Sequence, residues 1–118
     1  MRLLVCDDDP SVGAFLSSVF ALDAWAVTTV ESGPECIAAV HAQPPDVIVL
    51  DQVMPEMTGI EVASVIRKSG YTKPIILFSA YLDTETVEQA RKLGIRTCLA
   101  KTEVDRLPET LWQLAAGA

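Results

Sequence analysis

Acidic side chains follow two of the apolar runs in this sequence. Asp7, Asp8 and Asp9 come directly after the first run, and Asp51 ends a later one. Carboxylates that gather at close range repel one another unless a cation lies among them. Mg²⁺ is the hard, oxygen-seeking ion that keeps waters and phosphate oxygens as its other ligands. If the fold brings these four residues together, they predict a magnesium site.

Asp51 is also suited to act as a nucleophile toward a phosphoryl group, because a neighbouring metal ion offsets the charge on the transferred oxygens. Such a transfer needs a hydroxyl donor and a cation as well. Ser79 ends another apolar run, and Lys101 follows the last one. Singly, each residue has an ordinary role open to it: Asp9 as a helix cap, Ser79 in a turn, Lys101 on the surface. Their joint occurrence favours phosphoryl chemistry.

The elements that must position these residues are five short apolar runs alternating with helical patterns. This rhythm predicts βα units that wind a parallel sheet, and the apolar runs suggest strands covered on both faces. The common order for five such strands is 2-1-3-4-5, which makes the two strands that end at the acids neighbours. The expected strands are Leu3 to Cys6, Ala26 to Val30, Val47 to Leu50, Ile75 to Ser79 and Thr97 to Leu99.

Five helices are expected between and after these strands. Thr58 with Glu61 reads as a capping box at the start of the third helix, and Gly94 as the glycine that ends the fourth. The last helix should begin near Asp105, with Pro108 in its first turn. The expected ranges are about 12–20, 33–43, 58–70, 83–94 and 105–116.

Composition limits the classes of protein that the chain can be. Its 118 residues suit one domain, 1–118, and no apolar run approaches the roughly 18 residues that span a bilayer, so we expect a soluble, cytoplasmic protein without membrane contact. The net charge of −7 disfavours direct nucleic-acid binding. Cys6, Cys36 and Cys98 form no CxxC pair and are expected to be reduced and mostly buried.

Four stretches together resemble the receiver domains of bacterial response regulators in two-component signalling. They are LLVCDDDPSV, DVIVLDQVMPEMTGIE around Asp51, IILFSA ending near Ser79, and LAK ending at Lys101. The resemblance spans the chain and implies a flavodoxin-like α/β fold with a five-stranded parallel sheet and five helices. It also implies that a histidine kinase or phosphotransfer protein supplies the phosphate, and that the domain then changes conformation to regulate an output partner or domain. Such a domain is not an enzyme beyond its own phosphotransfer and dephosphorylation.

The same resemblance implies roles for individual residues. Mg²⁺ would be held by Asp8, Asp51 and the backbone carbonyl of Val53, with Asp7 acting through a metal-bound water. Ser79 would hydrogen-bond the acyl phosphate on Asp51. Lys101 would pair with the phosphate oxygens.

Three positions depart from the usual receiver pattern. Thr102 follows Lys101 where the family has a proline joined by a cis bond, which before a non-proline costs about 2.5 to 4 kcal/mol. A trans bond and a different placement of Lys101 are therefore both open. Cys98 stands where an aromatic side chain usually rotates inward, and the bulky Tyr81 stands two residues after the hydroxyl. The switching relay and access to the site are thus expected to differ from those of most relatives.

Two other functional classes compete with a phospho-acceptor. A Mg²⁺-dependent phosphohydrolase with an aspartyl intermediate commonly has a second acid two residues after the nucleophile, and that residue here is Val53. A receiver-like module that works without phosphorylation would be expected to have lost Asp51, Lys101 or the acid pair, and it has lost none. No GxxxxGK stretch is present, so a P-loop NTPase is excluded. The output stays open, as a lone receiver or a piece of a longer regulator.

Overall fold

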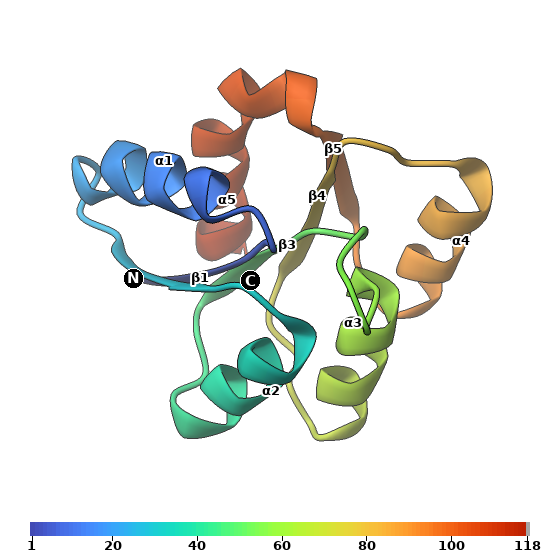
Figure 1. The fold of residues 1–118 in the computed structure, drawn as a ribbon. Helices are drawn as coiled ribbons and strands as arrows, with labels where there is room; N and C mark the ends of the chain where they lie inside the picture. Colours follow the sequence, from blue (N-terminus) through green and yellow to red (C-terminus); the bar gives the residue numbers. More distant parts are fainter. Residues whose placement is uncertain (118) are drawn as a thin grey trace.

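The computed structural model describes residues 1–117, which form an α/β structure of three layers (Figure 1). One parallel sheet is the middle layer, and helices form the layer on either side of it. The five strands lie in the order β2-β1-β3-β4-β5, as the sequence predicts. Their bounds match the expected runs to within one residue at either end. The strands are β1 (Arg2–Cys6), β2 (Ala26–Val30), β3 (Val47–Leu50), β4 (Ile75–Ser79) and β5 (Thr97–Ala100).

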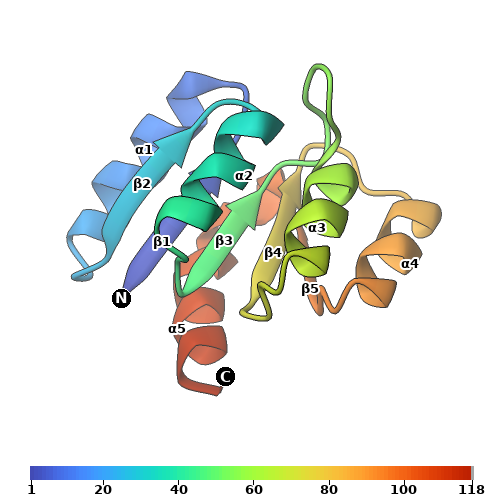
Figure 2. The same ribbon diagram turned by 90° about the horizontal axis from the view of Figure 1, so that it is seen from below.

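Helices cover both faces of this sheet (Figure 2). Side chains of α1 and α5 pack on one face, and those of α2, α3 and α4 pack on the other. The helices are α1 (Pro10–Ala21), α2 (Gly33–Ala42), α3 (Gly59–Lys68), α4 (Thr84–Lys92) and α5 (Leu107–Gly117). No helix within residues 1–117 is long and apolar enough to cross a membrane.

Alternation along the strands explains why the core has two halves. Successive side chains of a strand point to opposite faces of a sheet. Along β1, Leu3 and Val5 join the cluster beneath α1 and α5, whereas Leu4 and Cys6 join the cluster on the other face. The central strands β3 and β4 are buried throughout, which requires their near-continuous apolar sequences.

Helix ends follow the caps expected from the sequence. The Asp9 side chain caps α1 by accepting a hydrogen bond from the Ser11 N–H at 3.0 Å. Thr58 and Glu61 form both bonds of the capping box at the start of α3. Gly94 has a φ of +76°, a conformation that favours glycine, just after α4 ends.

The structure differs from the expected elements at two places. Strand β2 is not covered on both faces: it is an edge strand with three of its five residues exposed, among them Thr28 and Thr29. The last helix, α5, begins at Leu107 and not near Asp105, because residues Lys101–Arg106 form a separate 3₁₀-helix, η1. The Glu103 side chain accepts a hydrogen bond from the Ala100 N–H at 3.0 Å, which holds the chain in this turn as it leaves β5.

The two tryptophans and the three cysteines take structural positions. Trp25, just before β2, is buried and lies against Trp112 of α5, with ring centroids 4.7 Å apart and planes tilted by 41°. The three thiols are free; Cys6 and Cys36 are buried, and Cys98 is half-buried, as expected for reduced packing residues.

Candidate functional site

The carboxyl ends of β1 and β3 are neighbours, and their register places two carboxylates side by side. Cys6 pairs with Leu50, so Asp7 and Asp51 are the next residues along adjacent strands. The Asp51 N–H donates to the Cys6 carbonyl at 2.9 Å and the Asp7 N–H to the Val30 carbonyl at 3.2 Å. These backbone hydrogen bonds continue the pairing of the strands by one residue, so the backbone of both Asp7 and Asp51 is held in place.

Three of the predicted acids form one cluster. Asp7, Asp8 and Asp51 each offer a carboxylate oxygen within 4.8 Å of the others. Asp7 and Asp51 are only 3% and 4% exposed, whereas Asp8 is exposed and closes the cluster toward solvent. Asp9 does not belong to it, because its side chain turns back to cap α1.

The oxygens of this cluster fit a hard divalent cation. Asp7 Oδ2 is buried, and the Lys101 ammonium, 2.7 Å away, offsets only part of the negative charge that the three acids gather. Two buried acids and one exposed acid give the all-oxygen set, open on one side, that Mg²⁺ prefers when it keeps waters and phosphate oxygens as ligands. The donor set is therefore right for magnesium.

Ser79 and Lys101 reach the same carboxylate from the ends of β4 and β5. The Ser79 hydroxyl donates to Asp51 Oδ1 at 2.9 Å. The Lys101 ammonium lies 3.4 Å from Asp51 Oδ2 and 2.7 Å from Asp7 Oδ2. No cis peptide bond occurs in residues 1–117, so the bond to Thr102 is trans, and Lys101 still contacts both buried acids.

Burial and charge set the protonation behaviour of the site. Burial raises the pKa of Asp51, and the neighbouring Asp7 charge adds to the rise, against the lowering effect of Ser79, Lys101 and the Val53 N–H. For Lys101, desolvation lowers the pKa, but the combined attraction of Asp7 and Asp51 outweighs it and raises the pKa overall. The ionised form of Asp51 is therefore destabilised in the folded protein, and a cation in addition to Lys101 would stabilise it.

The loop from β3 to α3 forms one rim of the site. The Val53 N–H lies 3.4 Å from Asp51 Oδ1, which places Val53 beside the candidate acceptor. Its side chain is 61% exposed, and that of Tyr81, on the loop after β4, is 67% exposed. Neither side chain buries the acid cluster, so Tyr81 does not act as a packed cover over it.

Sequence reasoning gave no role to Gln52 or to a close approach at Gly59, yet both shape this loop. Gln52 holds the start of α3 through its side-chain oxygen, which accepts from the Ile60 N–H at 2.9 Å, and its carbonyl, which accepts from the Gly59 N–H at 3.0 Å. A Cβ at Gly59 would lie 2.4 Å from the Asp51 carbonyl oxygen. The motif around Asp51 includes both residues, but no hydrophobic periodicity in the sequence predicts their contacts.

Replacing Gly59 with alanine should therefore destabilise the fold by about 2 to 4 kcal/mol, because backbone blocks the new methyl group. Urea unfolding followed by circular dichroism measures this loss. Gly117→Ala is the matched control: a Cβ there meets nothing within 4 Å, and we expect a change within about 0.5 kcal/mol. Equal effects of the two substitutions would contradict the close approach at Gly59.

Fold and site together define a class of protein, the receiver domain, and comparison with known proteins agrees. The response regulator receiver domain family matches residues 3–111, so the chain belongs to this family. It is a receiver domain of two-component signalling.

Individual relatives place the chain more closely. It is 36% identical over 80 residues to the probable transcriptional regulatory protein TcrX of Mycobacterium tuberculosis, covering 68% of this chain and 34% of TcrX. It is 35% identical to the DNA-binding response regulator MtrA of Mycolicibacterium smegmatis, covering 73% of this chain and 37% of MtrA. The chain thus spans about a third of the length of these relatives.

Solved structures confirm the flavodoxin-like fold. The receiver domain of the Francisella response regulator 1452 has a TM-score of 0.89 at 29% identity and covers 98% of this chain, which in turn covers 96% of it. The response regulator TrrA of Thermotoga maritima, solved in complex with Mg²⁺ and BeF, has a TM-score of 0.85 at 29% identity, with 96% and 97% coverage.

Proposed function

We propose that residues 1–118 act as one receiver domain in which Asp51 accepts a phosphoryl group with the help of Mg²⁺. The observation that carries this proposal is the set of contacts on one buried carboxylate: Ser79 on one oxygen of Asp51, Lys101 on the other. The relation to TrrA, whose structure holds Mg²⁺ and BeF, supports the choice of ion.

Asp8, Asp51 and the backbone carbonyl of Val53 would hold the ion, with Asp7 binding it through a water. When bound, Mg²⁺ supplies positive charge that offsets the charge on the phosphoryl oxygens and on the clustered acids. The clustered acids support this assignment, because the single Lys101 ammonium beside Asp7 and Asp51 offsets only one of the three negative charges.

The residues of the chain do the remaining work by position and charge. An Asp51 oxygen forms a bond to phosphorus while the bond from phosphorus to the donor's imidazole nitrogen breaks. Asp51 attacks as a carboxylate, so it needs no general base. The Ser79 hydroxyl and the Lys101 ammonium, now on Asp51, can turn to the phosphoryl oxygens once they arrive.

The donor in this proposal is a histidine kinase or phosphotransfer protein, and the output is a partner or domain that senses the phosphorylated form in the cytoplasm. The domain catalyses only its own phosphotransfer and dephosphorylation, since Val53 supplies no acid for turnover. MtrA is a DNA-binding response regulator, which suggests a transcriptional output. The −7 charge argues against nucleic-acid binding by this domain itself.

The test is the intact mass of the protein after incubation with acetyl phosphate and Mg²⁺. One phosphate should be added, and EDTA should prevent the addition. A mass that stays unchanged in the presence of Mg²⁺, with the protein shown to be folded, would overturn the proposal.

Asp8→Ala should weaken Mg²⁺ binding by about tenfold or more, because it removes a carboxylate ligand. Asp9→Ala is the matched control: its side chain caps α1, so it should lower stability by about 1 kcal/mol and leave metal affinity nearly unchanged. Titration of the metal-free protein with Mg²⁺, followed by NMR, compares the two. Equal losses would mean that the acids are assigned in the wrong register.

A further inference from the structure

A cavity of about 580 Å³ lies at the end of the sheet where β4 and β5 begin, away from the carboxyl ends that carry Asp51. Basic side chains line it, from Arg67, Lys73 and Arg96, and none of its described lining residues is acidic. Such a site is unexpected in a chain whose net charge is −7. Its size is within the range of small-molecule sites.

Arg67 is held rigidly at the wall of this cavity. Its Nε donates to the Leu93 carbonyl at 2.8 Å, and its Nη1 donates to the carbonyls of Tyr71 and Lys73 at 2.9 and 2.8 Å. Nη2 forms no hydrogen bond within residues 1–117. Burial lowers the pKa of the Arg67 guanidinium, and the interaction with Tyr71 opposes this only in part. Arg67 therefore presents a fixed, partly desolvated positive charge with one donor nitrogen free.

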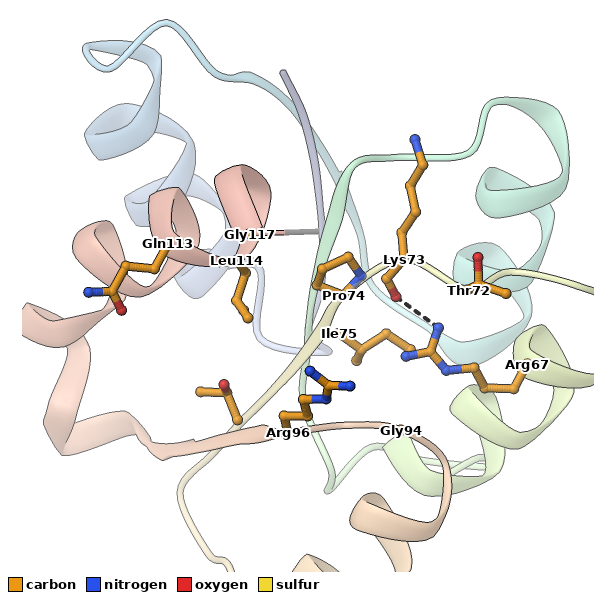
Figure 3. Close-up of a pocket in the computed structure, with 11 residues that line it drawn as sticks. Arg67, Thr72, Lys73, Pro74, Ile75, Gly94, Arg96, Gln113, Leu114 and Gly117 are labelled. Carbon is orange, nitrogen blue, oxygen red and sulfur yellow. Dashed lines mark hydrogen bonds between the residues drawn. The ribbon is translucent and has the colours of Figure 1, made fainter.

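Arg96 brings a second guanidinium to the same place. Figure 3 shows the guanidinium groups of Arg67 and Arg96 pointing toward one another beside Ile75, while the Lys73 ammonium points away. That ammonium lies 3.3 Å from Asp46, which neutralises it. No ion pair among residues 1–117 involves Arg96. Two like charges facing one another across a hollow are stabilised by an anion between them.

The geometry points to a binding site for an organic phosphate, a small molecule with a phosphate monoester and an apolar body. A monoester carries a charge of about −1.5 to −2 at neutral pH, which balances two guanidinium groups, and guanidinium is the cation best shaped to bind phosphate. Pro74, Ile75 and Leu114 provide an apolar wall against which the organic part would pack. Inorganic phosphate would fill only the charged end.

Adenosine monophosphate is the probe for this site, used with the full chain in EDTA so that the acid cluster takes no part. NMR titration should show saturable binding with a Kd of about 1 mM or tighter, with shifts concentrated at Gly94, Arg96 and Thr97. Inorganic phosphate should bind more weakly at the same residues, and adenosine should not bind. The absence of saturable binding by adenosine monophosphate, or shifts centred on Asp51, would overturn the proposal.

Arg96→Gln removes one of the two charges without removing a hydrogen bond that the fold uses. It should weaken adenosine monophosphate binding by about tenfold or more. Arg91→Gln is the matched control, because Arg91 lies on exposed α4, pairs with Glu88 and does not line the cavity. The proposal fails if Arg96→Gln binds as tightly as the parent protein, or if Arg91→Gln loses as much affinity.

Discussion

Asp51→Asn should abolish the addition of phosphate from acetyl phosphate, while the parent protein gains one phosphate under the same conditions. The amide lacks the charged oxygen that attacks phosphorus, and no other carboxylate in the cluster contacts both Ser79 and Lys101. Intact mass spectrometry measures the result. A phosphate that still adds to the Asn variant would show that another residue is the acceptor.

Thermal stability shows whether Asp51→Asn has lost only the phosphate acceptor or has also lost the fold. Because the folded protein raises the pKa of Asp51, stability from this group is present at low pH and is lost as pH rises through the raised pKa. In EDTA at pH 7, Asp51→Asn should therefore melt at a temperature no lower than the parent. At pH 4, any excess of the melting temperature of Asp51→Asn over that of the parent should be smaller. An Asn variant that melts well below the parent at pH 7 would contradict this account of the charge.

Lys101→Met should slow phosphorylation by acetyl phosphate by about 10²-fold, the usual cost of removing one group that stabilises charge in a transition state. Methionine keeps the length of the side chain but leaves Asp7 and Asp51 without their shared ammonium. The time course of intact mass at saturating Mg²⁺ gives the rate. Magnesium is kept saturating so that weaker metal binding does not account for the loss.

Lys68→Met provides the matched control for that experiment. Lys68 is exposed near the end of α3, far along the chain from the acid cluster, and its loss should leave the rate unchanged. If Lys101→Met is phosphorylated as fast as Lys68→Met, the contacts of Lys101 with the two carboxylates do not matter for transfer.

The sequence predicted the strands well because burial on both faces leaves an unambiguous apolar run. Strands β3 and β4 are the clearest case, since every residue of each is buried. Strand β2 was placed correctly but its exposure was not, because a five-residue run such as AVTTV does not say that it lies at the edge. Edge position follows from sheet order, which depends on how all the strands pack.

Contacts at the site were harder to predict than the residues that form it. Asp7, Asp51, Ser79 and Lys101 could be identified from their types and places after strands, but the 2.7 Å contact of Lys101 with Asp7 depends on η1. That 3₁₀-helix is fixed by a hydrogen bond from the Ala100 N–H to the Glu103 side chain, for which the sequence offers no periodic signal. The carbonyls around Arg67 likewise come from two separate loops and leave no pattern in the chain.

The contact between Trp25 and Trp112, whose rings are tilted by 41°, makes the protein's own fluorescence sensitive to the position of α5. The chain has two tryptophans, and both belong to this single contact between the start of β2 and helix α5. Emission therefore comes almost wholly from one place, on the side of the sheet that α1 and α5 cover. A shift of α5 would change how the two indoles overlap and would alter the emission without any added dye. Conformational changes that leave α5 in place would not alter the tryptophan emission, however large they are elsewhere in the protein.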